Sequence, residues 1–512
     1  MISLHEDSSV QPDVTLRKKG NFANDVLKIA GGTTSAQASS ILASPILMRI
    51  YSPGDFGMSA LFAAIEVMLG AFACMRYERS ILLPERDEDA ANALSLSLCL
   101  VSALSVCTIP PVWLGGSLLL HFLKAPELLP YLWLLPPAVL IGGANMALVR
   151  WNLRKENFGR ISILEVLNAI CTVTAQISLG LATKGKGGML IVANLLGMTI
   201  ATAGMIVLTW RDSADIFRHS ISYQKMIYTL KRYSRFPKYG LASSVLDRLA
   251  WQMPSFLLSG FFSTTVVGEY ALGSRVIRVP MSLMGTSISN VFSQRAADAR
   301  NKGFLGKQAE LAFQYLIRLS MFPCLLLALI GKDVFVVAFG HRWAEAGVYT
   351  QILSVWLCFW FISAPLSAIF SVLEQQHLEL RFTVLIFLSR LCAFLIGGFV
   401  GSARLAVLLY SGSGASIYAY YCVVLLTQAG VPVSRIVKVL LTNVAHFLPA
   451  GLIIGVLLYF RLSSVVTVAV SCILLAAYYT NLVRIDPAVR EWIGTILNRF
   501  SIQRFSSTTV SI

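Results

Sequence analysis

Residues 188–210 read GMLIVANLLGMTIATAGMIVLTW, a run without a single charged side chain. An α-helix rises about 1.5 Å per residue, so a run of this length spans the roughly 30 Å hydrocarbon core of a bilayer. The run therefore predicts a transmembrane helix, and the rest of the chain can be searched for more runs of the same kind.

Fourteen such segments follow one another along the 512 residues. Gly, Ala, Ser and Thr are frequent inside them, and small residues let helices approach closely in lipid. We therefore expect an all-α membrane protein in which about 14 transmembrane helices pack as a bundle. The expected spans are 25–49, 56–75, 90–110, 128–149, 161–183, 188–210, 238–262, 267–292, 308–331, 347–372, 382–400, 405–429, 443–460 and 464–483.

The composition excludes a string of soluble domains. Hydrophobic residues make up 56% of the chain and charged residues only 13%, against about 25% in an average soluble domain. The six His have no metal-ligand spacing, and no phosphate-binding glycine loop occurs, so we expect no metal, no organic cofactor and no catalytic residue. A coupling proton or sodium ion is the one small cofactor that we consider.

The net charge of +16 has a topological explanation. With the N-terminus placed inside, 29 of the 42 Lys and Arg residues fall on the inner side, eight fall outside, and the other five lie within spans. Membrane proteins collect Lys and Arg on the cytoplasmic side. We therefore expect an even number of spans, both termini in the cytoplasm, and no nucleic-acid partner.

The chain contains a candidate internal repeat. Residues 52–61 (SPGDFGMSAL) align with residues 263–272 (STTVVGEYAL) at an offset of 211, and Ser, Gly, Ala and Leu coincide at four of the ten positions. Each stretch is the short outer turn between the first two spans of its half. With six spans in each half, the halves are parallel repeats about an axis along the membrane normal, and we expect the substrate between them near the midplane.

These features divide the chain into six expected parts. Six-helix N- and C-lobes are joined by a linker with amphipathic character, and two further helices follow the second lobe. The expected ranges are a cytoplasmic tail (1–20), the N-lobe (21–212), the linker (213–236), the C-lobe (237–434), two added helices (435–485) and a cytoplasmic amphipathic tail (486–512).

The second half holds an excess of intramembrane arginine. A charge at the bilayer centre costs about 2.5–3.5 kcal/mol even on the insertion scale, so such side chains usually face a polar interior. One deep acid, Asp247, and Glu269 near the outer surface are too few to neutralise this group. Arginine binds phosphate through two parallel hydrogen bonds and stays charged in a low dielectric, so an anionic substrate is expected, with a diphosphate a good fit. The five arginines are Arg248, Arg275, Arg278, Arg318 and Arg390.

We expect the diphosphate to contact Arg278 and Arg318 in particular. The structural alternative is that each arginine pairs with an acid or with helix carbonyl groups. Glu66 and Asp247 are the candidate sites for a coupling proton or cation, and an ion pair with the adjacent Arg248 is the alternative for Asp247.

Six stretches together resemble bacterial polysaccharide-unit flippases of the Wzx type, in the multidrug/oligosaccharidyl-lipid/polysaccharide exporter superfamily. The resemblance is dense over about 40–100 and 233–303, and elsewhere it is one of topology. The stretches are ASPILMRIYSPGDFG (43–57), RYERSILLPERDEDAA (76–91), FPKYG (236–240), QMPSFLLS (252–259), GEYALGSRVIRVP (268–280) and QRAA (294–297).

The resemblance implies two pseudo-symmetric six-helix lobes that face each other across a cavity, as in the MATE fold, plus two C-terminal helices. It also implies a flippase of the bacterial inner membrane that moves an undecaprenyl-diphosphate-linked oligosaccharide from the inner to the outer leaflet by alternating access, in O-antigen, capsule or exopolysaccharide biosynthesis. Arg248 departs from the family pattern, in which an uncharged residue is more common. The matched motif positions, which add Arg49 and Arg76 to the substrate-binding candidates, are Arg49, Asp55, Arg76, Glu78, Arg275 and Gln294.

Two other functions stay open at this point. A multidrug or small-molecule exporter of the same fold would need an acidic or aromatic cavity for cationic drugs, which the arginine excess argues against. A membrane polymerase or ligase acting on the same lipid carrier would need a larger outer loop than the roughly 20 residues available here. Membrane lipids and a polysaccharide polymerase or export machinery are the expected partners beside the lipid-linked glycan.

Overall fold

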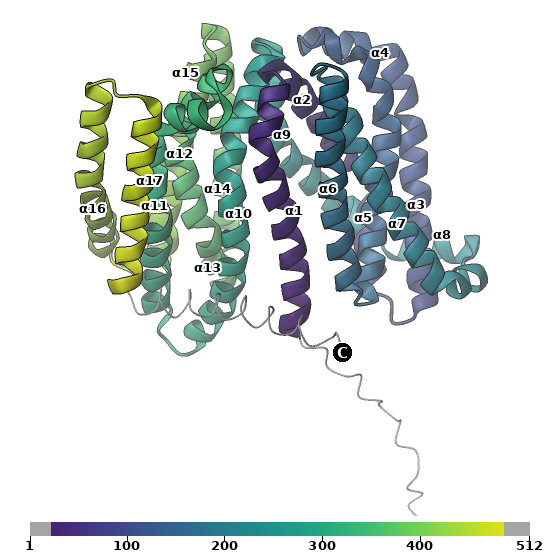
Figure 1. Cartoon of the computed structure of the whole chain (residues 1–512). Helices are drawn as coiled ribbons and strands as arrows, with labels where there is room; N and C mark the ends of the chain where they lie inside the picture. The colour runs from purple at the N-terminus through teal and green to yellow at the C-terminus, as the bar shows by residue number, and fades with distance from the viewer. Residues whose placement is uncertain (1–21, 486–512) are drawn as a thin grey trace, which may run out of the picture.

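The computed structural model describes residues 22–485, and within that range every regular element is a helix. The first lobe is built from six long helices, which Figure 1 shows in purple and blue. They are α1 (Phe22–Ile50), α2 (Pro53–Gly70), α3 (Asp87–Cys107), α5 (Leu135–Arg154), α6 (Phe158–Ala182) and α7 (Gly188–Ser220).

The second lobe has six long helices in the same order, and α12 continues into the short α13 after a break at Ser367. Two further helices pack against α11 at the outer edge of this lobe (Figure 1). The C-lobe helices are α9 (Ala242–Phe261), α10 (Thr264–Asn301), α11 (Leu305–Phe339), α12 (Ala344–Leu366) with α13 (Ala368–Val372), α14 (Gln376–Val400) and α15 (Ala403–Gln428); the added pair is α16 (Val433–Tyr459) and α17 (Ser464–Ile485).

This architecture confirms the predicted all-α fold with two six-helix lobes and two added helices. Both ends of the described chain lie at the same end of the bundle, as fourteen crossings require (Figure 1). We call this end the termini end, and the opposite end, which carries the α1–α2 and α9–α10 turns, the hairpin end. The assignment of the termini end to the cytoplasm stays a prediction from the Lys and Arg distribution.

Four of the fourteen long helices, the first two of each lobe, lie where the lobes meet. They are α1, α2, α9 and α10, and they are not among the ten helical segments that are long and apolar enough to cross a membrane on length and composition alone. Figure 1 shows α1 running between the two groups of helices, and α2 packs against α9 and α10 across the lobe boundary.

The lobes are sealed against each other at the hairpin end. Gly57 of α2 and Gly268 of α10 cross so closely that their backbones touch, because neither residue has a side chain. Beside this crossing, the Trp343 indole donates to the main-chain oxygen of Met48 (3.0 Å), and the ring of Phe56 stands edge-on to Trp343 at 5.4 Å. Backbone, hydrogen-bond and ring contacts thus close this end.

Matched caps begin the two crossing helices. Ser52 is the N-cap of α2, where its hydroxyl and the Asp55 carboxylate form a reciprocal capping box. Ser263, 211 residues later, is the N-cap of α10 and accepts from the Val266 amide. The aligned serines therefore cap the N-termini of corresponding helices in the two halves.

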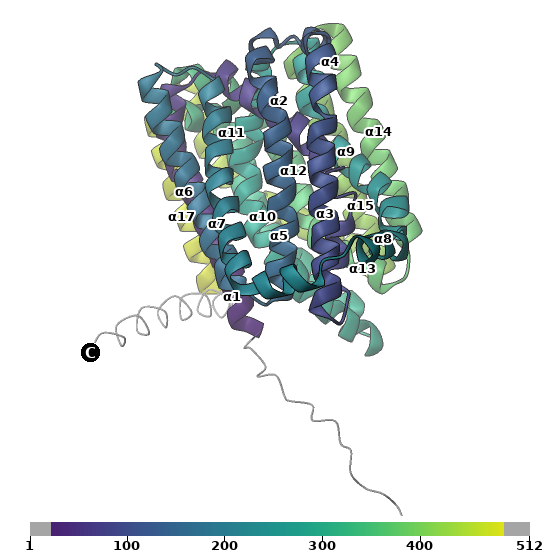
Figure 2. The ribbon, with the colours of Figure 1, turned by 90° about the vertical axis from the view of Figure 1, so that its right-hand side faces the viewer.

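The lobes are connected along the termini end. Helix α7 continues past residue 213 to Ser220, and α8 (Tyr223–Arg232) follows and packs against α3, as Figure 2 shows. Asn92 holds this segment by donating to the Ser220 carbonyl (2.9 Å) and accepting from the Ser222 amide (3.0 Å). The chain enters the C-lobe through the π-helix η3 (Phe236–Leu241). The predicted tails, 1–20 and 486–512, lie outside the described residues.

Two short elements occupy the hairpin end of the N-lobe. Pro110 and Pro111 stand in the first turn of α4 (Ile109–Phe122), which is too short to count as a span. The 3-10 helix η2 (Pro126–Leu134) then leads into α5. Proline is favoured at the first turn of a helix, where its missing N–H costs nothing, so the prolines start a new helix rather than interrupt a span.

Candidate functional site

Arg275 and Arg278 lie one turn apart on α10, the helix that carries most of the contact between the lobes. The Arg275 side chain is exposed on α10, and it lies two helical turns after Gly268, on the face of α10 that meets α2. Arg278 is half-buried, and its guanidinium stands over the ring of Trp251 of α9 at 5.8 Å. The pair presents two neighbouring positive charges inside the bundle.

Arg390 of α14 is enclosed in an aromatic cage. Its guanidinium lies over the rings of Trp251 (5.2 Å), Trp356 (5.6 Å) and Tyr410 (5.6 Å), and the residue is only 4% exposed. Its Nη2 atom has no hydrogen-bond partner among the described residues. Cation–π contacts of this kind contribute about 0.5–2 kcal/mol each. They hold four helices of the C-lobe (α9, α12, α14 and α15) around one cation.

Asp247 belongs to the same part of the C-lobe. It is exposed on α9, one turn before Trp251, and its negative charge acts on Arg390. Trp251 contacts both Arg278 and Arg390, so the structure brings together an acid, an indole and two arginines.

Arg248 points away from its neighbour Asp247 and toward the other lobe. Its Nη1 donates to the main-chain oxygen of Val67 in the last turn of α2 at 3.1 Å, and it lies 3.8 Å from where a Cβ of Gly70 would stand. A helix C-terminus leaves carbonyl groups without partners and attracts cations. This contact matches the alternative in which an intramembrane arginine pairs with helix carbonyl groups, here of the opposite lobe.

Arg76 follows the end of α2, in the connection to the 3-10 helix η1 (Tyr77–Leu82). Its backbone has a φ of 69°, a left-handed conformation that is uncommon outside glycine, and its Nε is buried with no hydrogen-bond partner among the described residues. Glu78 lies 4.0 Å away. Burial, followed by the charge of Arg79, lowers the pKa of Arg76, with Arg248 adding to the effect and Glu78 opposing it. Positive charge from both lobes therefore gathers here.

Two predicted arginines are placed elsewhere. Arg49 is exposed in the last turn of α1, at the hairpin end. Arg318 lies where α17 packs on α11: the Tyr478 hydroxyl donates to its main-chain oxygen at 2.7 Å, and its charge acts on that tyrosine. The described contacts of Arg318 thus join it to an added helix, whereas Arg275 and Arg278 line the lobe boundary.

Glu66 lies within the N-lobe. Its carboxylate is half-buried between α2 and α5, and its Oε1 is 3.6 Å from where a Cβ of Gly142 would stand, with the Met198 side chain of α7 alongside. The Glu66 carboxylate is therefore in van der Waals range of α5 and stays within the N-lobe. The two candidate coupling acids, Glu66 and Asp247, are in different lobes, and within residues 22–485 no group of three His, Cys, Asp or Glu could hold a metal ion.

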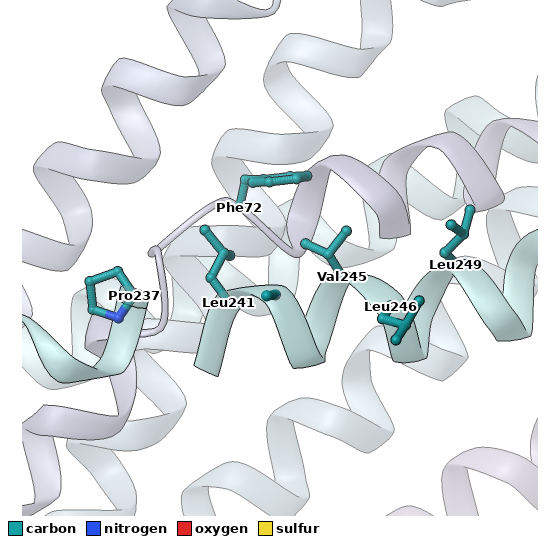
Figure 3. Close-up of a pocket in the computed structure, with 7 residues that line it drawn as sticks. Phe72, Pro237, Leu241, Val245, Leu246 and Leu249 are labelled. Atoms are coloured by element: carbon teal, nitrogen blue, oxygen red, sulfur yellow. The ribbon is translucent and has the colours of Figure 1, made fainter. Parts of the chain in front are cut away.

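An open apolar hollow of about 570 Å³ lies between the lobes (Figure 3). Phe72, just after α2, forms the N-lobe wall, and Figure 3 shows it opposite side chains of α9. Sequence reasoning missed this hollow and the cage around Arg390, because their walls come from helices that are distant in sequence. The C-lobe wall includes Pro237, Leu241, Val245, Leu246 and Leu249.

Residues 46–348 match the family described as polysaccharide biosynthesis protein. The succinoglycan biosynthesis transport protein ExoT of Rhizobium meliloti (strain 1021) is 22% identical over 323 residues, and the match covers 61% of this chain and 61% of that protein. The chain thus matches about three-fifths of the length of this curated relative.

Solved structures share the fold at low sequence identity. The lipid II flippase MurJ, in an inward closed conformation, superposes with a TM-score of 0.64 at 13% identity, over 88% of this chain and 98% of that one. A multidrug resistance MATE family transporter of the MOP superfamily, in an inward-facing conformation, gives a TM-score of 0.59 at 17% identity, over 80% and 98% of the two chains. These likenesses establish a two-lobe transporter fold.

Proposed function

The chain belongs to the polysaccharide biosynthesis protein family, and on that premise we propose that it is a flippase for an undecaprenyl-diphosphate-linked oligosaccharide. It would move this lipid from the inner to the outer leaflet of the bacterial plasma membrane. A polysaccharide polymerase or export machinery would then receive the unit. Its relatives are a polysaccharide transport protein, a lipid II flippase and MATE transporters, which supports transport rather than catalysis.

One observation carries the proposal: two neighbouring arginines lie on α10, the helix through which the C-lobe packs against α2 of the N-lobe. Arg275 is exposed, and Arg278 lies one turn away. Each guanidinium can form two parallel hydrogen bonds to phosphate oxygens and stays charged when desolvated. A diphosphate would supply the negative charge that complements this pair.

The way the lobes meet supports alternating access. At the hairpin end the lobes touch through Gly57–Gly268 and through Trp343–Met48, contacts that can break without unfolding either lobe. Loading then takes place from the termini end, which the Lys and Arg distribution assigns to the cytoplasm. Separation of the lobes at the hairpin end releases the head group on the other side.

We propose that Glu66 and Asp247 couple the movement to a proton or sodium ion. Glu66 is on α2 of the N-lobe and Asp247 is on α9 of the C-lobe, two helices that pack against each other across the lobe boundary. Asp247 acts on the caged Arg390, so protonation of Asp247, or cation binding there, would change the charge balance of the C-lobe cluster.

The test is lipid-linked oligosaccharide flipping in proteoliposomes, together with mass spectrometry of lipids from a deletion strain. The double variant Arg275→Gln, Arg278→Gln should lose at least about tenfold in rate, because a hydrogen bond to a charged group contributes about 1.5–3 kcal/mol. Arg435→Gln, at an exposed pair with Glu310, is the matched control and should keep its rate.

The deletion strain should accumulate complete units that an external glycan label cannot reach. A double variant that flips at the unsubstituted rate would refute the role of the two arginines. A deletion strain without accumulation and with unchanged surface glycan would refute the function and favour a small-molecule exporter.

A further inference from the structure

The apolar hollow between α2 and α9 differs from the Arg275–Arg278 pair in both position and chemistry. It has a volume of about 570 Å³ and is largely open, so it is a surface groove between the lobes rather than an enclosed cavity. The walls are carbon side chains: one aromatic ring from the N-lobe and proline and aliphatic groups from the C-lobe (Figure 3). Such a surface binds hydrocarbon through the hydrophobic effect and offers little to a sugar.

Two guanidinium groups border this apolar surface, one from each lobe. Arg248 lies on α9 directly before the lining residue Leu249. Its Nη1 reaches across to the end of α2, where it is 3.8 Å from a Cβ position on Gly70. Gly70 is two residues before Phe72, the N-lobe wall of the hollow. The Arg76 side chain lies 3.7 Å from a Cβ position on Gly240, the residue before the lining Leu241. A hydrocarbon site is thus flanked by cations on both walls.

Arg76 also approaches the backbone of the C-lobe. Its side chain is at ordinary contact distance from a Cβ position on Gly240, within the π-helix η3. The Arg76 Nε is buried there without a hydrogen-bond partner among the described residues, so a phosphate oxygen that reached it after a movement of the side chain would satisfy this donor.

We propose that this hollow holds the first isoprenoid units of a polyprenyl diphosphate while Arg76 and Arg248 bind its phosphates. The inference rests on the proposed function and adds a loading site for the lipid end of the substrate, separate from the Arg275–Arg278 pair. Charge complementarity selects this occupant: an apolar chain joined directly to a multiply charged diphosphate fits an apolar groove between two guanidinium groups.

The site also links binding to lobe movement. Phe72 and Arg76 belong to the N-lobe, whereas the rest of the wall and Arg248 belong to the C-lobe. A lipid bound here touches both lobes, so it stabilises the arrangement in which these walls are close. Separation of α2 from α9 at the termini end would divide the site.

The experiment places a photoreactive benzoylphenylalanine at Phe72 of the full chain in phospholipid nanodiscs. The probe is undecaprenyl diphosphate, and adducts are identified by mass spectrometry. The control position is Leu441 of α16, which is 60% exposed on the outer pair of helices. We expect at least tenfold more undecaprenyl diphosphate adduct at position 72 than at position 441. Unlabelled undecaprenyl diphosphate should compete with this labelling, and undecaprenol should not. The double variant Arg76→Gln, Arg248→Gln should lose the excess adduct at position 72.

A second variant tests the hollow without removing charge. Leu246→Trp fills the space and should reduce flipping at least tenfold, while Leu441→Trp should leave the rate unchanged. Equal labelling at 72 and 441, adducts of phospholipid alone at 72, or full flipping by Leu246→Trp would each overturn the inference.

Flipping by the unsubstituted chain is measured in the same preparations. Flipping without excess labelling at 72 refutes the lipid site and leaves the proposed function standing. Labelling at 72 without any flipping refutes the proposed function instead.

Discussion

The glycine crossing at the hairpin end gives the sharpest test of how the lobes close. A Cβ on Gly57 would stand 2.9 Å from the Gly268 nitrogen, and a Cβ on Gly268 would stand 2.7 Å from the Gly57 nitrogen. Ordinary contact begins at 3.4 Å, so these two distances alone require the helices to separate by 0.5–0.7 Å. The carbonyl groups of Thr264 and Pro53 lie closer still and require more. We therefore expect Gly57→Ala and Gly268→Ala to destabilise the closed hairpin end.

The size of the effect follows from the cost of overpacking. An added methyl group in a tightly packed contact costs about 1–3 kcal/mol. Every 1.4 kcal/mol is a factor of ten, so the population with a closed hairpin end should fall about 5- to 150-fold relative to the separated one. Gly412→Ala is the control, because a Cβ there meets nothing within 4 Å.

The assay is the distance between spin labels at Lys186→Cys and Arg342→Cys, two exposed hairpin-end positions in different lobes. The labels are introduced after the nine native cysteines have been replaced. Gly57→Ala and Gly268→Ala should shift the distance distribution to longer values, and Gly412→Ala should not. A distribution that is identical in all three variants and in the unsubstituted chain would refute the argument that this crossing closes the lobes.

Three further substitutions test other contacts. Arg390→Ala should lower the stability of the C-lobe by about 1–3 kcal/mol, because it removes the cation from its cage, and an unchanged thermal midpoint in detergent would contradict this. Ser52→Ala should cost about 0.5–2 kcal/mol through loss of the capping box with Asp55, which hydrogen exchange of the first turn of α2 measures; exchange at the original rate would count against the cap. Tyr478→Phe removes the bond to Arg318 and should speed exchange in α17, at a cost of about 0.5–1.5 kcal/mol, while unaltered exchange would show that the bond does not hold this helix.

The fold could be predicted because the properties that determine it belong to single segments of the sequence. The length of an apolar run sets whether a helix can cross a bilayer, and the alternation of Lys and Arg between loops sets the number of crossings. Neither property depends on which helices are neighbours. The helices α9 and α10 are also predicted as spans, because the ranges 238–262 and 267–292 each contain only three charged residues.

The environments of the arginines could not be predicted in the same way. Depth along a helix says nothing about the direction of a side chain, so Arg275 and Arg390 looked alike in the sequence. In the structure Arg275 is exposed, whereas Arg390 is caged by rings from three other helices. Asp247 and Arg248 are adjacent, but successive helical positions are turned by about 100°. Arg248 consequently meets Val67, which lies 181 residues away.

The contact between Gly57 and Gly268 has a meaning beyond its tightness. The two residues are separated by 211 positions, the offset that relates the two halves of the chain. A residue can touch its own symmetry counterpart only on a rotation axis, so the pseudo-twofold axis of the molecule runs through this crossing. In a protein made of a single lobe, the same contact would join one glycine to its copy, as in an isologous homodimer. The chain thus has the geometry of a fused dimer, in which a side chain added at either glycine would disrupt the same contact.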